Sequence, residues 1–257
     1  MNPSPPTPAP RPTNRPAPWG VRLQRSPVTF SLIGVTGFIY LLQELSRAAF
    51  RFDLVIELGK KDALPILAGQ LWRLVTPVFL HASIPHLFVN MYSLFALGPA
   101  VERFFGSPRF LAVYLLSGVG GVIFSLAFNP EAASVGASGA IFGLLGALAM
   151  FLYLHRPVFG PGGGMMLRQL IIVGALNLVY GATVPGIDMW GHVGGLVSGI
   201  TCTLYFGPRL VPTFTGGVPS GLTDQQPWTE VRTRVLIAAL GIGALAALAI
   251  ALAQLAR

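Results

Sequence analysis

The chain has 257 residues, of which 53% are hydrophobic and only 10% are charged. Soluble domains are typically about a quarter charged, so this composition excludes an ordinary soluble domain and indicates a surface that lies largely in lipid. The formal net charge of +8 does not indicate a nucleic-acid partner, because the arginines are scattered at the ends of apolar runs rather than gathered on one face. The single cysteine, Cys202, excludes an internal disulfide.

Residues 1–27 form a region unlike the rest of the chain, with nine prolines and four arginines. Such a segment cannot build a core, and we predict a disordered cytoplasmic tail. A signal peptide is not expected, because the charged region is too long and no small-residue cleavage site follows the first apolar run.

Seven apolar runs follow this tail, and each is long enough to cross a hydrocarbon core of about 30 Å as a helix. They lie at about 28–45, 84–101, 110–128, 138–155, 167–184, 188–206 and 233–256. Segment 47–83 mixes aromatic and basic residues and is predicted to lie in the membrane interface. Segment 207–232 is rich in proline, glycine and threonine and is predicted to be an irregular cytoplasmic linker. We therefore predict an all-α integral membrane protein.

The distribution of lysine and arginine predicts the orientation of the runs. With the N-terminus inside, eleven of these residues fall on the inner side and six on the outer side. The inner ones are Arg11, Arg15, Arg22, Arg25, Arg103, Arg109, Arg156, Arg168, Arg209, Arg232 and Arg234. Since inner loops carry the excess of positive charge, we expect the N-terminus in the cytoplasm and the C-terminus outside.

This orientation places four polar residues at one depth. Runs 84–101, 138–155 and 188–206 would all pass from outside to inside, and His86, Asn90, Ser138 and His192 stand near the starts of these runs. Histidine within a span is costly, and its default interpretation is functional.

Two stripes of small residues indicate which helices meet. Positions 139, 143 and 147 in one run and 191, 195 and 199 in another recur every four residues, so each set forms a smooth face. Close approach of these faces would bring Ser138 to His192. A serine beside a histidine where water is scarce is the minimal apparatus for acyl transfer. Asn90 and His86, four residues apart on one helix face, could donate hydrogen bonds to an oxyanion.

Each signal has a simpler interpretation when taken alone. A serine among small residues is more often a packing residue, and glycine stripes usually mark helix contacts. Asn90 could make a hydrogen bond between helices. His81, His86 and His192 could instead bind a metal, but His81 and His86 are five apart and no cysteine or carboxylate completes the set. The shared depth favours the catalytic interpretation over each of these, and we predict no metal or other cofactor.

The motifs together resemble those of the rhomboid intramembrane serine proteases. The matching motifs are Gly136-Ala137-Ser138-Gly139, Gly191-His192-Val193-Gly194-Gly195, His86-x-x-x-Asn90, Trp72-Arg73 and Gly98-x-x-x-Glu102-x-x-x-Gly106. The resemblance covers roughly 28–206 and implies a six-helix catalytic core. The run within 233–257 would then add a seventh helix, a six-plus-one arrangement. It further implies a multi-pass protein, with a bacterial inner membrane as the expected location and transmembrane proteins as substrates.

The resemblance also implies roles for individual residues. Ser138 would be the nucleophile and His192 the general base, while Asn90, His86 and the Ser138 amide would form the oxyanion hole. Phe142 would pack on the histidine. The supporting residues would be the glycines of the two motifs and the Trp72-Arg73 pair, which we interpret as loop anchors: Gly136, Gly139, Gly191, Gly195, Trp72 and Arg73.

Two questions stay open at the level of sequence. Asp188, four residues before His192, could orient the imidazole as the acid of a triad, or it could cap the helix that starts there. The turn-like Pro185-Gly186-Ile187 before it favours the cap. The rival to a protease is an inactive relative or a transporter that binds membrane helices without cutting them.

Overall fold

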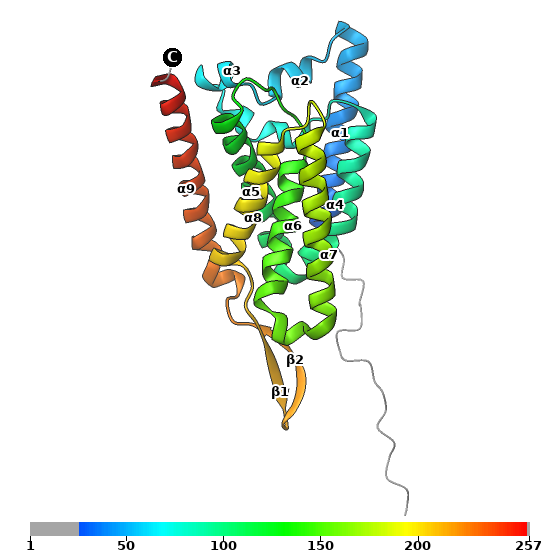
Figure 1. Ribbon diagram of the computed structural model, residues 1–257, viewed down its shortest axis with the longest axis vertical. Helices are drawn as coiled ribbons and strands as arrows, with labels where there is room; N and C mark the ends of the chain where they lie inside the picture. Colours follow the sequence, from blue (N-terminus) through cyan, green and yellow to red (C-terminus); the bar gives the residue numbers. More distant parts are fainter. Residues whose placement is uncertain (1–25, 256–257) are drawn as a thin grey trace, which may run out of the picture.

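In the computed structural model, which describes residues 26–255, long helices run side by side as a bundle (Figure 1). The long helices are α1 (Pro27–Phe50), α4 (Ile84–Phe105), α5 (Ser107–Phe128), α6 (Ser138–Leu154), α7 (Arg156–Thr183), α8 (Met189–Phe206) and α9 (Trp228–Leu255). The short helices α2 (Leu54–Gly59) and α3 (Ala63–Leu67) and the 3-10 turns η1 (Leu71–Leu74) and η2 (Thr76–Phe79) lie between α1 and α4. The predicted all-α membrane bundle is confirmed. Nearly all of the predicted disordered tail, residues 1–25, lies outside the described residues.

The number of membrane spans is only partly determined by the helices. Within residues 26–255, five are long and apolar enough to cross a bilayer: α1, α4, α5, α7 and α9. Helix α6 is apolar but has 17 residues, and α8 has 18 residues interrupted by histidine, serine and threonine. Both lie inside the bundle (Figure 1), and the six-plus-one count stays a prediction.

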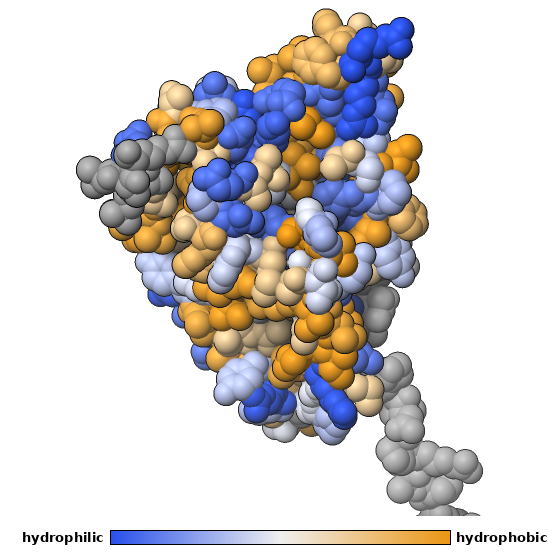
Figure 2. All heavy atoms as spheres, turned by 45° about the horizontal axis from the view of Figure 1, so that its top comes forward, coloured by the Kyte–Doolittle hydropathy of each residue, from blue (hydrophilic) through white to orange (hydrophobic). Residues whose placement is uncertain are grey.

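The outside of the bundle is apolar in the way that a membrane protein requires. Large side chains on α1, α4, α7 and α9, such as Phe38, Phe88, Leu176 and Leu240, are more than half exposed. Figure 2 shows hydrophilic residues gathered toward the end that carries α2 and α3, and hydrophobic residues over much of the flank. Exposed apolar surface of this extent marks contact with lipid, so the chain is a multi-pass membrane protein.

Glycines allow α5, α6 and α8 to meet backbone to backbone at the centre. A Cβ on Gly195 would collide with the carbonyl of Gly139, and a Cβ on Gly199 would collide with the carbonyl of Gly143. A Cβ on Gly121 of α5 would stand 2.6 Å from the carbonyl oxygen of Gly191. The predicted small-residue stripes therefore do face each other, with a third helix against them.

Glu102 fixes the neighbouring ends of three helices, α1, α4 and α5. Its carboxylate accepts hydrogen bonds from the backbone N–H of Val28 (3.0 Å) and of Thr29 (2.9 Å). It also accepts from the hydroxyls of Thr29 (2.7 Å) and Ser107 (2.6 Å). These bonds tie the C-terminal end of α4 to the start of α5, and they also anchor the start of α1. Gly98 leaves the room for this, because a Cβ there would lie 2.6 Å from Thr29 Cγ2.

The prediction of an irregular linker at 207–232 is wrong. This segment contains an antiparallel hairpin of β1 (Leu210–Thr215) and β2 (Val218–Asp224), and α9 already begins at Trp228. Gly216 and Gly217, with φ of 61° and 79°, form the two-residue turn that suits a tight hairpin. An ion pair of 2.7 Å between Asp224 and the buried Arg109 fixes the hairpin to α5.

One helix boundary also differs from its prediction. Helix α7 starts at Arg156, eleven residues before the apolar run at 167–184. The helical backbone is broken at Gly160 (φ 55°, ψ −148°), which precedes Pro161, so two helical pieces are joined across a kink. The stretch 156–166, with two prolines and four glycines, carried no apolar signal.

Candidate active site

Ser138 and His192 meet at the N-terminal ends of two adjacent helices. Ser138 is the first residue of α6, and His192 lies in the first turn of α8. The Oγ of Ser138 is 2.9 Å from the Nε2 of His192, a hydrogen-bond distance. A Cβ on Gly139 would lie 3.1 Å from the carbonyl oxygen of Gly191, so the absence of a side chain at residue 139 favours this close approach.

The imidazole of His192 is held by packing. The ring of Phe142, one turn below Ser138, stacks on it with centroids 4.5 Å apart and an interplanar angle of 18°. On the α7 side the ring faces Gly181, where a Cβ would be in van der Waals contact with Nδ1 at 3.4 Å. Nδ1 has no hydrogen-bond partner among residues 26–255, and the ring is 9% exposed.

Asp188 is the N-cap of α8. Its Oδ1 accepts a hydrogen bond of 2.9 Å from the backbone N–H of Gly191, and the predicted cap is confirmed. This satisfies one of the free N–H groups at the helix start. Within residues 26–255 the only hydrogen-bond partner of the imidazole nitrogens is Ser138, so the ring is not bonded to the Asp188 carboxylate.

Replacing Asp188 with asparagine is therefore expected to leave turnover near the wild-type value and to change thermal stability little. Asparagine caps a helix about as well as aspartate, so the substitution keeps the cap. It removes the carboxylate that a catalytic triad would need. Cleavage rates and melting temperatures of the two purified proteins check this. A fall in turnover below about a hundredth of wild type in folded protein, as when an orienting carboxylate is removed, would instead make Asp188 an acid that orients His192.

Asn90 and His86 line the same cleft as Ser138 from α4. Asn90 is buried, and its Nδ2 donates to the carbonyl oxygen of His86 at 2.9 Å. The His86 ring lies against Gly136, where a Cβ would be 2.8 Å from both Cε1 and Nε2. Gly136 has φ of 132° and donates its N–H to the carbonyl of Pro77 at 2.9 Å, which fixes the approach to Ser138.

Trp72 and Arg73 hold the segment between α1 and α4. Arg73 is buried and donates to the backbone carbonyls of Lys60 (2.9 Å) and Glu57 (2.7 Å). The Nε1 of Trp72 donates to the carbonyl of Leu58 at 2.9 Å, and its ring is half exposed. These contacts match the expected role as loop anchors.

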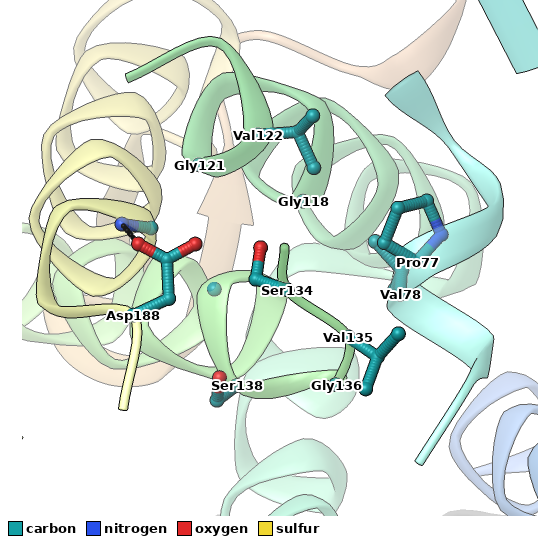
Figure 3. A pocket seen from close by; sticks show the side chains of 12 residues that line it. Pro77, Val78, Gly118, Gly121, Val122, Ser134, Val135, Gly136, Ser138 and Asp188 are labelled. Atoms are coloured by element: carbon teal, nitrogen blue, oxygen red, sulfur yellow. Dashed lines mark hydrogen bonds between the residues drawn. The ribbon is translucent and has the colours of Figure 1, made fainter. Parts of the chain in front are cut away.

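Two cavities adjoin Ser138. A cleft of about 970 Å³ runs between α4, α6 and α7, from His86 and His192 down to Met166. On another side of the serine lies a pocket of about 30 Å³, walled by Val78, Gly118 and Val122. Figure 3 shows the side chains of Ser134 and Asp188 close to this pocket, with Ser138 at its edge.

A comparison with protein families matches residues 68–209, more than half of the chain, to the Rhomboid domain. The chain belongs to the rhomboid family. Among its relatives, Rhomboid protease GluP of Bacillus subtilis is 39% identical over 171 residues, which is 66% of this chain and 33% of the relative. RHOMBOID-like protein 6, mitochondrial, of Arabidopsis thaliana is 39% identical over 56% of this chain and 46% of the relative. The Putative rhomboid protease YdcA of Bacillus subtilis is 37% identical over 53% of this chain and 67% of the relative.

This rhomboid thus spans between a third and about half of the length of the first two of these relatives. The matched region holds every residue that we predicted for the site, from Trp72 to Gly195. GluP is named as a protease and YdcA as a putative protease, which supports membership of a protease family.

Sequence reasoning missed several residues that shape this rhomboid site. Gly121 lies against the start of α8, and Gly181 lies against the imidazole. The carbonyl of Pro77 accepts a hydrogen bond from the Gly136 N–H, and Lys61 contacts the segment before Ser138. The run Gly118-x-Gly120-Gly121 could have indicated a third smooth helix face. Pro77 and Lys61 carry no local signal, because their partners lie more than fifty residues away in the chain.

Proposed function

We propose that this protein is an intramembrane serine endopeptidase that cleaves transmembrane proteins with a Ser138–His192 dyad. The observation that carries the proposal is the 2.9 Å contact between Ser138 Oγ and His192 Nε2, beside the cleft of a membrane bundle. Membership of the rhomboid family and similarity to named rhomboid proteases support it.

The chemistry would proceed by acyl transfer. Ser138 Oγ attacks the peptide carbonyl carbon while His192 Nε2 accepts the hydroxyl proton, giving a tetrahedral oxyanion. Its collapse breaks the C–N bond, and the proton on His192 passes to the leaving amine, which leaves an acyl ester on Ser138. A water molecule from the outer side, deprotonated by His192, then hydrolyses the ester and restores both side chains.

The oxyanion would be stabilised by donors on two sides. The Ser138 N–H belongs to the first turn of α6, where free N–H groups and the helix dipole favour negative charge. Asn90 and His86 line the cleft across from it. One Asn90 N–H is bound to the His86 carbonyl, and an amide has a second N–H, which is available to an oxyanion.

The cleft between α4 and α7 suits an unwound transmembrane segment. Apolar residues such as Val89, Leu145 and Val173 line it, together with Ser93 and Asn177, whose hydroxyl and amide could meet backbone groups of an extended chain. A substrate helix must open before cleavage, since its carbonyls are bonded along the helix. We therefore expect substrates with helix-weakening residues near the cut.

The residue before the cleaved bond is expected to be small. A pocket of about 30 Å³ adjoins Ser138 and is closed by Val78, Gly118 and Val122, which leaves room for the side chain of alanine or serine but not leucine. In a panel of single-span substrates, alanine at this position should raise kcat/KM over leucine roughly 10–200-fold. Val122→Ala, which widens the pocket, should narrow this ratio. Equal rates for both substrates would show that the pocket does not receive this side chain.

We further propose a bacterial inner membrane location with the N-terminus in the cytoplasm and the active site toward the outside. The excess of lysine and arginine on the side of the β1–β2 hairpin supports this orientation. A cysteine introduced at Gly217, at the tip of the hairpin, should react with an impermeant thiol reagent only after the membrane is opened.

A serine-directed fluorophosphonate tests the proposal against a non-cleaving helix binder or transporter. Labelling of Ser138 in folded, detergent-solubilised protein, located by peptide mapping, is the expected result. Absence of label in protein that unfolds cooperatively would favour the non-cleaving alternative.

A further inference from the structure

Lys61 is a fully buried lysine in the outer segment of the chain, between α2 and α3. Lysine is almost never fully buried without partners, because an ammonium loses its hydration there. Its Nζ donates to the backbone carbonyls of Asn129 (2.6 Å) and Ala132 (2.5 Å). Both belong to the segment 129–137, which joins the end of α5 to Ser138.

The backbone of Lys61 holds the same segment. Its N–H donates to the carbonyl of Ser134 at 2.9 Å, and the N–H of Ser134 donates back to the Lys61 carbonyl at 3.1 Å. Lys61 therefore makes four hydrogen bonds to a segment that has no helix of its own. Two residues after Ser134, Gly136 is bonded to Pro77, and Ser138 follows.

Lys61 is itself held in place from the other side. Arg73 binds the carbonyls of Lys60 and Glu57, and the Thr76 hydroxyl donates to the carbonyl of Gly59 at 2.6 Å. The turn that presents Lys61 is thus fixed before the lysine reaches the segment 129–137. The ammonium also stands at the C-terminal end of α5, capped by Asn129, where a helix dipole favours positive charge.

We propose that Lys61 is a positioning residue that holds segment 129–137 so that Ser138 and the oxyanion-binding N–H groups keep their reactive geometry. The inference rests on the proposed serine protease function. Lys61 acts through backbone carbonyls, not by touching substrate. A displacement of Ser138 by a fraction of an ångström would lengthen its contact with His192, and misplacement of about 1 Å can reduce a rate roughly a hundredfold.

The charge of Lys61 is part of this arrangement. Burial lowers the pKa of its ammonium, while Asp188, Asp62 and Glu131 oppose that shift. A charged donor makes hydrogen bonds roughly twice as strong as a neutral one. An uncharged side chain of similar length would fill the space without holding the carbonyls.

Lys61→Met tests the proposal because it keeps the length and apolar stem but removes the ammonium. We expect kcat to fall roughly tenfold to a hundredfold with KM within about twofold, and amide hydrogen exchange of residues 130–137 to become faster. Labelling of Ser138 by a small fluorophosphonate, which needs no membrane substrate, should slow in parallel. Arg51→Met removes a charge from the same outer segment at an exposed residue, and it should behave as wild type.

Three comparisons keep the outcome decisive. Labelling of the wild type but not of Ser138→Ala would support the protease function itself. An unchanged labelling rate and exchange pattern in Lys61→Met would overturn the role of Lys61 and leave the protease function standing. Lys61→Arg, which keeps charge and donors, should react faster than Lys61→Met, and the reverse order would indicate simple packing. Should Lys61→Met fail to fold, Lys61→Gln replaces it, and equal rates for the Gln and Arg variants would overturn the proposal.

Discussion

Replacement of Ser138 or of His192 with alanine is expected to abolish cleavage and leave the fold intact. Removing the nucleophile or the base of a serine protease typically lowers turnover about 10⁴–10⁶-fold. The Ser138 hydroxyl is hydrogen-bonded to His192, and neither side chain belongs to the glycine contacts that join α5, α6 and α8. Thermal stability in detergent should therefore stay near the wild-type value. Cleavage of a single-span model substrate, with the product termini mapped, measures the loss.

The double variant provides the internal control. If the two residues act as a unit, Ser138→Ala combined with His192→Ala should be no less active than either single variant. Ser220→Ala, in the exposed hairpin, should cleave as wild type. Wild-type-like turnover in either single variant would remove the proposed mechanism. If a chelator inhibited cleavage and added zinc restored it, the result would instead indicate a metal site at the histidines.

The placement of the reactive pair could be predicted because it follows from periodicity. Glycines four residues apart give two flat helix faces, and flat faces in lipid pack closely. Ser138 and His192 each stand beside the outer end of such a face, so their meeting required no knowledge of the loops. The distribution of lysine and arginine predicted, independently of the glycines, that Asn90 and His86 lie at the same depth as this pair.

Other features could not be predicted because their causes are distant in sequence. The bond from Lys61 to Asn129 spans 68 residues, and neither residue indicates the other. The hairpin was missed because proline and glycine were interpreted as breakers, while Gly216 and Gly217 instead form its turn. The start of α7 was missed because stretch 156–166 holds two prolines and four glycines, which we interpreted as helix breakers.

Asn90→Ala is expected to lower turnover by roughly 10²–10³, the usual loss for one oxyanion donor, with a smaller change in apparent affinity. Asn90 is 4% exposed and lines the cleft beside Ser138. Its bond to the His86 carbonyl fixes the rotation of the amide, so the remaining N–H is held in one direction. A donor that is fixed before the reaction stabilises the developing charge without reorganisation.

The matched comparison is Asn177→Ala on the α7 wall of the same cleft. The Nδ2 of Asn177 also donates to a carbonyl one turn earlier, that of Val173, at 2.8 Å. Each substitution therefore removes one hydrogen bond from an asparagine amide to the carbonyl four residues before it. We expect Asn177→Ala to change KM at most, because that amide stands beside a bound segment rather than the reacting carbonyl. Steady-state kcat and KM for both variants separate the two roles. A rise in KM with unchanged kcat in Asn90→Ala would make Asn90 a residue that binds substrate, and the oxyanion would then depend on His86 and the start of α6.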